Sequence, residues 1–375
     1  MRQASGDGSF LRRLNQVAVL RALRGTESAT LAELAKAAQL SRATADGIVE
    51  TLLRDGWAEE VVPSDGLRGR PARRFAFRGE AGHVAGVSVG ATGVLAMVAD
   101  LNGRVVARAA ESLPSDLPSA RRLAAVVDLV ERACAEAGLT AGALTAVGVG
   151  TTGVIDGEGR VVKSVVLEDW TGVRLQQELA ARIPVPLRVE NDMRLAVLAE
   201  HWQGAARGRR DVIYLHTGSR IGLGLLLGGV PHRGSHAAAG ELGGQPNSRW
   251  SAFHHVLDFA LSADPGELRA PLQAALFALE RARAGDARAA DAVEAFATGL
   301  AEGLVTLVTP LDPELVVIGG SLARAGELLA GPVRRYLESV CLYPPEVVVS
   351  ELGSDAVCVG AVRFALDHAE RLLLA

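Results

Sequence analysis

The segment HVAGVSVGATGVLAMVADLNGRVVARA, residues 83–109, alternates Val- and Ala-rich runs with Gly-containing turns. Within it, VSVGATG (87–93) has the pattern of a strand that enters a Gly-rich turn of the kind that wraps a phosphate, and DLNG (100–103) is typical of a hairpin turn. A comparable pattern of strand, Gly-containing turn, strand and GG turn occurs in RDVIYLHTGSRIGLGLLLGGVPHRG, residues 210–234. This weak internal duplication predicts two similar α/β lobes, each with a Gly-rich hairpin.

Composition places the chain among well-packed α/β proteins. It has 375 residues, 49% of them hydrophobic and 4% aromatic, so two or three compact units are expected. The cysteines Cys134, Cys341 and Cys358 are scattered, which predicts neither a disulfide framework nor a cysteine-rich zinc site and fits a reducing cytoplasm. Gly or charged residues interrupt every apolar run before about 18 residues, so we expect no membrane span and no secretion signal.

The first 80 residues form the basic end of the chain, with 13 Lys and Arg against 10 Asp and Glu, compared with 26 against 33 in the remainder. Thr30 and Glu33 form a predicted capping box, and Ser41 is the predicted N-cap of a following helix that ends before Gly56. The expected buried positions of the first helix are Leu14, Val17, Leu20 and Leu23, and those of the third are Ile48, Leu52 and Leu53. Two helices joined by so short a connection are typical of a helix-turn-helix.

The start of the third helix is the candidate DNA-reading element. In a helix-turn-helix this turn meets base edges in the major groove, so Arg42 is a candidate partner of guanine and Thr44 of a phosphate or a thymine methyl group. A small residue there lets the helix approach closely. The predicted contact residues are Ser41, Arg42, Ala43 and Thr44, with Ala45 also expected to point outward. The alternative is a three-helix bundle with an ordinary polar face.

The segment WAEEVVPSDGLRGRPARRFAFR, residues 57–78, follows as a predicted strand, Gly/Pro turn and strand rich in arginine. This pattern predicts a basic wing with few opposing acids, in which RGRP (68–71) enters an A·T-rich minor groove. A solvated charged face is the alternative. The wing residues predicted to contact DNA are Arg68, Arg70 and Arg73.

The order of these motifs and those that follow resembles the ROK family of repressors, open reading frames and kinases. The further motifs are VGVGTTGVIDGEGRV (147–161), VENDMRLAVLAE (189–200), AAGELGG (238–244), DPELVVIGGSLA (312–323) and GAVRFAL (360–366). The resemblance implies an α/β chain with a winged helix-turn-helix at residues 1–80, followed by a two-lobed actin-like domain of the sugar kinase and Hsp70 ATPase type. Lobe one is expected at residues 81–192 with the C-terminal helix, and lobe two at 193–353.

The resemblance also implies a sugar site in the cleft between the lobes. Asp192 matches the residue that in the kinases takes the proton from the attacking sugar hydroxyl, and Asn191 matches one that holds the sugar. Glu241 matches a sugar-binding Glu, while Gly153 and Ser164 fall where other members line the pocket. The alternatives are that Asp192 only caps a helix, that Glu241 is a solvated loop acid, and that Gly153 serves a hairpin turn.

Three departures from the family pattern argue against catalysis. Ser88 stands where a kinase has the phosphate-loop Asp, and Gly244 where a His normally follows the Glu by three. The zinc segment is replaced by QPNSRWSAFHHVLDF (245–259), in which adjacent His254 and His255 make a poor tetrahedral site and more simply belong to a helix. We therefore predict no zinc, no bound ATP and no kinase activity, although Arg220 could meet an anion at the former nucleotide position.

Three classes of function remain at this point. The first is a transcriptional regulator, acting as a repressor, that binds operator DNA and responds to a sugar or sugar-like ligand. The second is an active ATP-dependent sugar kinase with a DNA-binding appendage, and the third is a module that binds another protein. For the regulator we expect a cytoplasmic homodimer or homotetramer on an inverted-repeat operator, since two-fold pairing doubles the base contacts. The sequence leaves open the ligand, the operator and the choice between repression and activation.

Overall fold

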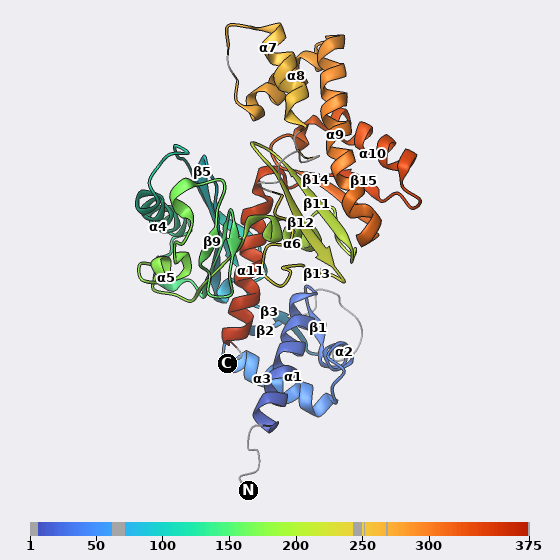
Figure 1. The fold of residues 1–375 in the computed structure, drawn as a ribbon. Helices are drawn as coiled ribbons and strands as arrows, with labels where there is room; N and C mark the ends of the chain where they lie inside the picture. The colour runs from blue at the N-terminus through green and yellow to red at the C-terminus, as the bar shows by residue number, and fades with distance from the viewer. Residues whose placement is uncertain (1–6, 62–71, 243–249, 251, 268, 374–375) are drawn as a thin grey trace.

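The computed structural model describes residues 7–61, 72–242, 250, 252–267 and 269–373, and its N-terminal unit is a helix-turn-helix with a small sheet (Figure 1). The Thr30–Glu33 capping box and the Ser41 cap are confirmed, since each side-chain oxygen accepts a bond from the predicted helix amide. The sheet is antiparallel in the order β1-β3-β2. The elements are α1 (Asp7–Arg24), β1 (Ala29–Thr30), α2 (Leu31–Ala37), α3 (Arg42–Arg54), β2 (Ala58–Val61) and β3 (Arg74–Phe77).

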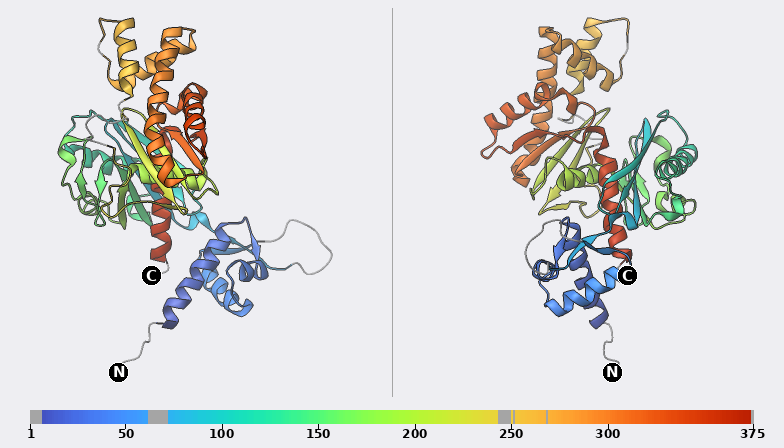
Figure 2. Two further views of the ribbon diagram at one scale, coloured as in Figure 1. Left: turned by 45° about the vertical axis from the view of Figure 1, so that its right-hand side comes forward. Right: turned by 180° about the vertical axis from the view of Figure 1, so that it is seen from behind.

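Two expectations for these helices are wrong. Leu14 is 49% exposed, because the first half of α1 extends past the rest of the unit; burial begins one turn later, at Val19. Figure 2 shows this end of α1 projecting from the domain. Ala45 is fully buried against the neighbouring helices, so the outward-facing run of α3 ends at Thr44.

The first lobe is built on a five-stranded sheet in the order β10-β7-β4-β5-β6. Strands β4, β5 and β6 form the predicted antiparallel meander with its DLNG turn, while β7 and β10 are parallel. Helix α4 covers one face of the sheet and α11 the other. The elements are β4 (His83–Val89), β5 (Gly93–Asp100), β6 (Val105–Ser112), α4 (Ser119–Glu136), β7 (Ala146–Thr151), β8 (Val154–Ile155), β9 (Val161–Lys163), α5 (Leu175–Ala180), β10 (Leu187–Asn191) and α11 (Ala356–Leu373).

The second lobe repeats this topology with the order β15-β14-β11-β12-β13. Strands β11, β12 and β13 form an antiparallel meander, and β14 and β15 are parallel to β11. This topology confirms the duplication predicted from the two Gly-rich hairpins. The elements are α6 (Asp192–Gln203), β11 (Val212–Thr217), β12 (Ile221–Leu227), β13 (Val230–Pro231), α7 (Phe253–Ala263), α8 (Pro271–Arg283), α9 (Ala287–Leu311), β14 (Leu315–Gly319), α10 (Glu327–Val340) and β15 (Glu346–Val349). Short 3₁₀ helices lie at Gly79–Ala81, Ala141–Ala143, Glu168–Trp170, Ala323–Ala325 and Gly353–Asp355.

The lobes meet at helices α6 and α11, which pack directly against each other. Gly360 of α11 lies against the backbone of Leu195 of α6 and leaves no room for a Cβ atom, so this contact requires glycine. At Gly224 of β12 an added Cβ atom would lie 2.3 Å from the Met193 carbonyl oxygen, so α6 packs closely on the second sheet. In both figures α11 runs between the lobes and ends beside the helix-turn-helix unit (Figures 1 and 2).

Helix α9 is the one described helix that is long and apolar enough to cross a membrane. Its side chains Leu300 and Leu304 are fully buried, and it packs against α7, α8 and α10 in the core of the second lobe. Packing in the protein core accounts for the apolar composition of α9.

Candidate functional site

The first turn of α3 presents the predicted DNA-reading side chains to solvent. Ser41 Oγ accepts a hydrogen bond from the Thr44 amide at 3.1 Å and lies 2.8 Å from Thr44 Oγ1, which fixes the start of the helix. Arg42, Ala43 and Thr44 are all exposed. The structure therefore brings the four predicted residues together on one surface that a DNA groove could reach.

The described wing arginines differ from expectation, because acidic side chains are paired with them. Arg73 contacts Glu60 at 2.9 Å and Glu50 at 3.3 Å, and its guanidinium lies 5.1 Å from the Phe75 ring centroid. The Glu60 contact raises the pKa of Arg73. Since Glu50 lies on α3 and Glu60 on β2, the Arg73 side chain links the start of β3 to both elements. Arg68 and Arg70 lie outside the described residues.

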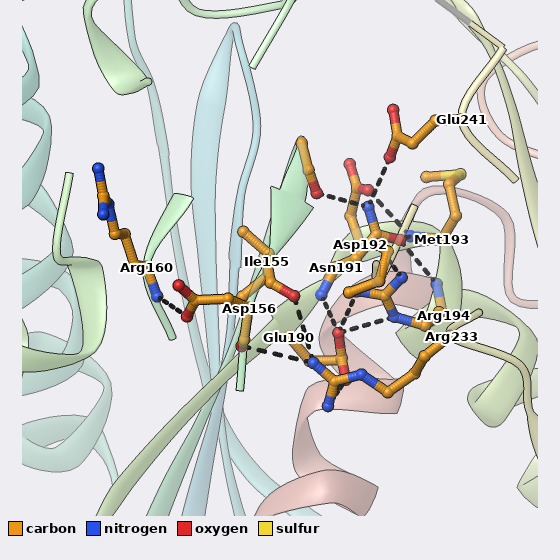
Figure 3. A network of polar contacts seen from close by, with 12 residues as sticks. Ile155, Asp156, Arg160, Glu190, Asn191, Asp192, Met193, Arg194, Arg233 and Glu241 are labelled. Carbon is orange, nitrogen blue, oxygen red and sulfur yellow. Dashed lines mark hydrogen bonds and ion pairs between the residues drawn. The ribbon is translucent and has the colours of Figure 1, made fainter. Parts of the chain in front are cut away.

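Asn191 is the centre of the predicted ligand site, where β10 ends and α6 begins (Figure 3). Its Oδ1 accepts hydrogen bonds from the Met193 and Arg194 amides, at 2.9 and 3.1 Å, so Asn191 is the N-cap of α6. Its Nδ2 donates to the Gly153 carbonyl at 3.0 Å and to Glu241 Oε1 at 3.3 Å. One amide thus joins the first lobe to the loop that carries Glu241.

Asn191 supplies the cap of α6, although Asp192 Oδ1 also accepts a hydrogen bond from the Met193 amide at 2.9 Å. The pKa of the Asp192 carboxyl group is strongly shifted. Burial, followed by the nearby Glu241 carboxylate, raises the pKa of Asp192 from 3.8 to about 7. Burial also raises the pKa of Glu241. Two carboxyl groups beside one amide can both accept hydrogen bonds from adjacent hydroxyl groups, and their raised pKa values mean that the surrounding protein disfavours their charge.

Gly153 and Ser164 lie side by side, but the Ser164 hydroxyl is used locally. Gly153 has φ +104°, and a Cβ atom there would lie 2.5 Å from the Lys163 carbonyl oxygen, so this close turn requires glycine. Ser164 Oγ accepts hydrogen bonds from the amides of Val166 and Leu167, at 3.3 and 3.2 Å. Gly153, Asn191 and Glu241 are thus joined by hydrogen bonds, whereas the Ser164 oxygen caps its own turn.

Sequence reasoning missed an ion network directly beneath this site. The Glu190 carboxylate contacts Arg194 Nη2 at 2.6 Å and Arg233 Nη1 at 3.2 Å, and both the Glu190 and Arg194 side chains are buried. Arg194 also donates to the Ala237 carbonyl at 3.0 Å, and Arg233 donates to the Ile155 carbonyl at 3.2 Å (Figure 3). The four-residue spacing of Glu190 and Arg194 around the Asn-Asp step is the signal that could have revealed the first pair.

Comparison with known proteins follows the same division into two parts. A ROK family model matches residues 84–250 and 268–368, and an IclR helix-turn-helix model matches residues 15–61. The chain belongs to the ROK family. This ROK chain is 22% identical to a xylose repressor of Bacillus subtilis (strain 168) over 386 residues, which cover 96% of this chain and 97% of the repressor.

Two further relatives span the kinase and regulator branches of the ROK family. A glucokinase of Thermotoga maritima is 30% identical over 249 residues, which cover 57% of this chain and 77% of the glucokinase. A solved ROK family transcriptional regulator, described as a homolog of the E. coli MLC protein, matches with a TM-score of 0.79 and 18% identity over 97% of this chain and 98% of its own. The winged helix-turn-helix and actin-like fold are thereby confirmed.

The ROK phosphate loop of this chain does not fit a magnesium nucleotide held through a carboxylate. Ser88 lies at the end of β4, opposite Leu95 of β5 and Gly150 of β7, and offers only a hydroxyl where a kinase has an acid. The buried Arg122 donates to the Gly90 carbonyl at 2.9 Å and to the Pro114 carbonyl at 2.8 Å, so the protein itself braces this turn. Ser88 therefore supplies no carboxylate to hold Mg²⁺ at this turn.

The described residues of the segment expected in place of a zinc site include two adjacent histidines. His254 and His255 lie in α7, as expected for a helix, with ring centroids 3.9 Å apart. Cys134 and Cys358 are buried in separate helices. Within the described part of the chain, no three His, Cys, Asp or Glu side chains are grouped to hold a metal ion. Gly244 lies outside that part.

Proposed function

We propose that this ROK chain is a transcriptional repressor whose affinity for operator DNA changes when a small polyhydroxylated ligand binds at Asn191, Asp192 and Glu241. The observation that carries the proposal is the exposed, Ser41-capped first turn of α3, which displays Arg42, Ala43 and Thr44 in a chain with a sugar-kinase body. The xylose repressor, matched over nearly its whole length, supports the same combination of parts. The protein acts in the cytoplasm as a homodimer or homotetramer.

The ligand class follows from the chemistry of the site. The Asn191 amide and the carboxyl groups of Asp192 and Glu241 accept and donate hydrogen bonds, which suits adjacent hydroxyl groups of a sugar. Asn191 is buried and Asp192 half-buried, whereas Glu241 is exposed, so a ligand that leaves the Asn191 and Asp192 polar groups unpaired is disfavoured. Because xylose and glucose are named for relatives, D-xylose and D-glucose are the first probes to use.

Operator binding is tested by footprinting the purified full chain on the DNA upstream of its own gene. Protection of an inverted repeat, with affinity reduced about tenfold or more by Arg42→Ala, supports the proposal, because a lost bidentate base contact costs about 1–3 kcal/mol. Arg335→Gln, an exposed change on α10 in the second lobe, is the matched control. Protection of no sequence, or an unchanged footprint for Arg42→Ala, contradicts it.

The second candidate is a sugar kinase, and the retained Asp192 favours it, since a carboxyl group with a pKa near 7 is suited to general base catalysis. The test is ADP production from ATP and Mg²⁺ with D-xylose or D-glucose. We expect none above the rate without sugar. Sugar-dependent turnover that Asp192→Asn abolishes would establish the kinase instead.

A further inference from the structure

The C-terminal helix α11 is shared between the ROK domain and the helix-turn-helix unit. Leu366 and Ala369, near its end, belong to one buried apolar cluster with Leu20 and Leu23 of α1 and Phe77 of β3. The same cluster continues into the first sheet through residues of β4 and β5. The two domains therefore have a continuous core, and α11 lies at the junction.

An ion cluster with a buried carboxylate closes this junction. It is formed by Glu370 of α11 with the exposed Arg21 and the mostly buried Arg24 of α1. Glu370 is only 5% exposed, and its carboxylate contacts Arg21 Nε at 2.6 Å and Arg24 Nη1 at 3.4 Å. The Arg24 guanidinium also lies 5.8 Å from the centroid of the Phe77 ring. Because an unpaired buried carboxylate is strongly unfavourable, this contact fixes one arrangement of α1 on α11.

The helix-turn-helix unit has a second attachment, at the linker. The Leu101 amide donates to the Gly79 carbonyl at 2.9 Å, and Gly79 lies so close to the Asn102 side chain that a Cβ atom would not fit. The apolar cluster also joins the two domains, but apolar contacts are not directional. The ion pairs of Glu370 with Arg21 and Arg24 add a directional contact to the linker and the apolar cluster.

The other half of α11 reaches the candidate ligand site. Gly360 contacts the backbone of Leu195, which lies in the same first turn of α6 as Asp192. At the other end of α6, Trp202 packs on α11, with the Arg363 guanidinium 5.7 Å from the centroid of the Trp202 ring. A shift of α6 relative to the first lobe would therefore change its contacts with α11 at both ends of α6. Packed helices do not deform continuously, so α11 would have to move as well.

We propose that Glu370 is a positioning residue that holds the helix-turn-helix unit in one orientation on the ROK domain and so transmits movement of α6 to the DNA-reading turn of α3. This inference rests on the proposed function. A dimer binds two half-sites at a set separation only if both reading helices are held in place, so loss of the Glu370 cluster relaxes the required separation.

The test measures operator affinity of the full chain by fluorescence anisotropy on the footprinted operator and on a version with five base pairs inserted between the half-sites. About half a helical turn is added by this insertion. We expect the wild type to bind the lengthened operator at least about 30-fold more weakly than the original operator. For Glu370→Gln, we expect this difference to be less than about fivefold. Arg21→Gln, whose side chain is 68% exposed, provides a variant with little risk to folding and shifts the result in the same direction.

The matched control is Glu294→Gln, which removes an exposed ion pair with Arg335 in the second lobe and keeps the wild-type loss on insertion. Hydrogen exchange of the free protein gives a readout without DNA: Glu370→Gln speeds exchange in α1 and the 79–82 linker and leaves the lobe sheets unchanged. If the wild type binds no operator, the proposed function fails and the exchange result alone decides. The inference is overturned if both variants lose as much affinity as the wild type when five base pairs are inserted. It is also overturned if hydrogen exchange in α1 is unchanged in Glu370→Gln.

Discussion

Replacing Asp192 with Asn is expected to stabilise the free protein at pH 8 more than at pH 5. The carboxyl group has a pKa of about 7 in the folded chain against an ordinary value of 3.8, so the folded state keeps a proton that the unfolded chain has released. Stability therefore falls as pH rises from about 4 to about 7, because the unfolded state binds fewer protons over that range. Asn carries no charge at any of these pH values.

The magnitude follows from the two pKa values. At about 1.4 kcal/mol per pH unit, the destabilisation by Asp192 is about 1.5 kcal/mol at pH 5 and about 4 kcal/mol at pH 8, so the variant gains at most about 2.5 kcal/mol more at the higher pH. Urea unfolding at both pH values measures the difference, with Asp116→Asn as a control at an exposed position. An equal change at both pH values would refute the argument that burial and Glu241 disfavour the Asp192 charge.

Three further results are expected. Thr44→Ala changes base preference in the centre of each half-site by about 1 kcal/mol, which selection of bound sequences from a random pool detects; an identical selected sequence would contradict the contact. Gly153→Ala destabilises the fold by about 1–3 kcal/mol, since φ +104° and the Lys163 carbonyl oxygen 2.5 Å from the new Cβ both oppose it; thermal unfolding measures this, and an unchanged midpoint opposes the assignment. Metal analysis shows far less than one zinc per chain, and stoichiometric zinc that resists chelation would contradict this.

Local signals predicted the parts of the fold that depend on neighbouring residues. The Thr30–Glu33 box and the Ser41 cap act within one turn of helix, and the two Gly-rich hairpins act between adjacent strands, so the sequence was sufficient to place them. The exposure of Leu14 could not be predicted in this way. Apolar spacing identifies the face of a helix, but not how far the neighbouring helices extend along it.

The candidate site shows the same limit at longer range. The Asn-Asp step was located from its motif, whereas the contacts of Glu190 with Arg233 and of Glu370 with Arg21 join residues far apart in the chain. No periodic pattern specifies such pairs, because they depend on how the lobes and domains pack. The expectation that few acids oppose the wing arginines was wrong for a related reason, since Glu50, a partner of Arg73, lies on a different element. Contact of Arg73 with DNA stays a prediction.

Control of DNA binding by the ligand site is tested by measuring operator affinity of the full chain with and without saturating sugar. D-Xylose and D-glucose are the probes, and Asp192→Asn is the comparison. We predict that one of them weakens operator binding at least fivefold, a coupling of about 1 kcal/mol, and that the variant binds the operator normally without responding. Operator affinity that neither sugar changes, or a response that the variant retains in full, would show that this site does not control DNA binding.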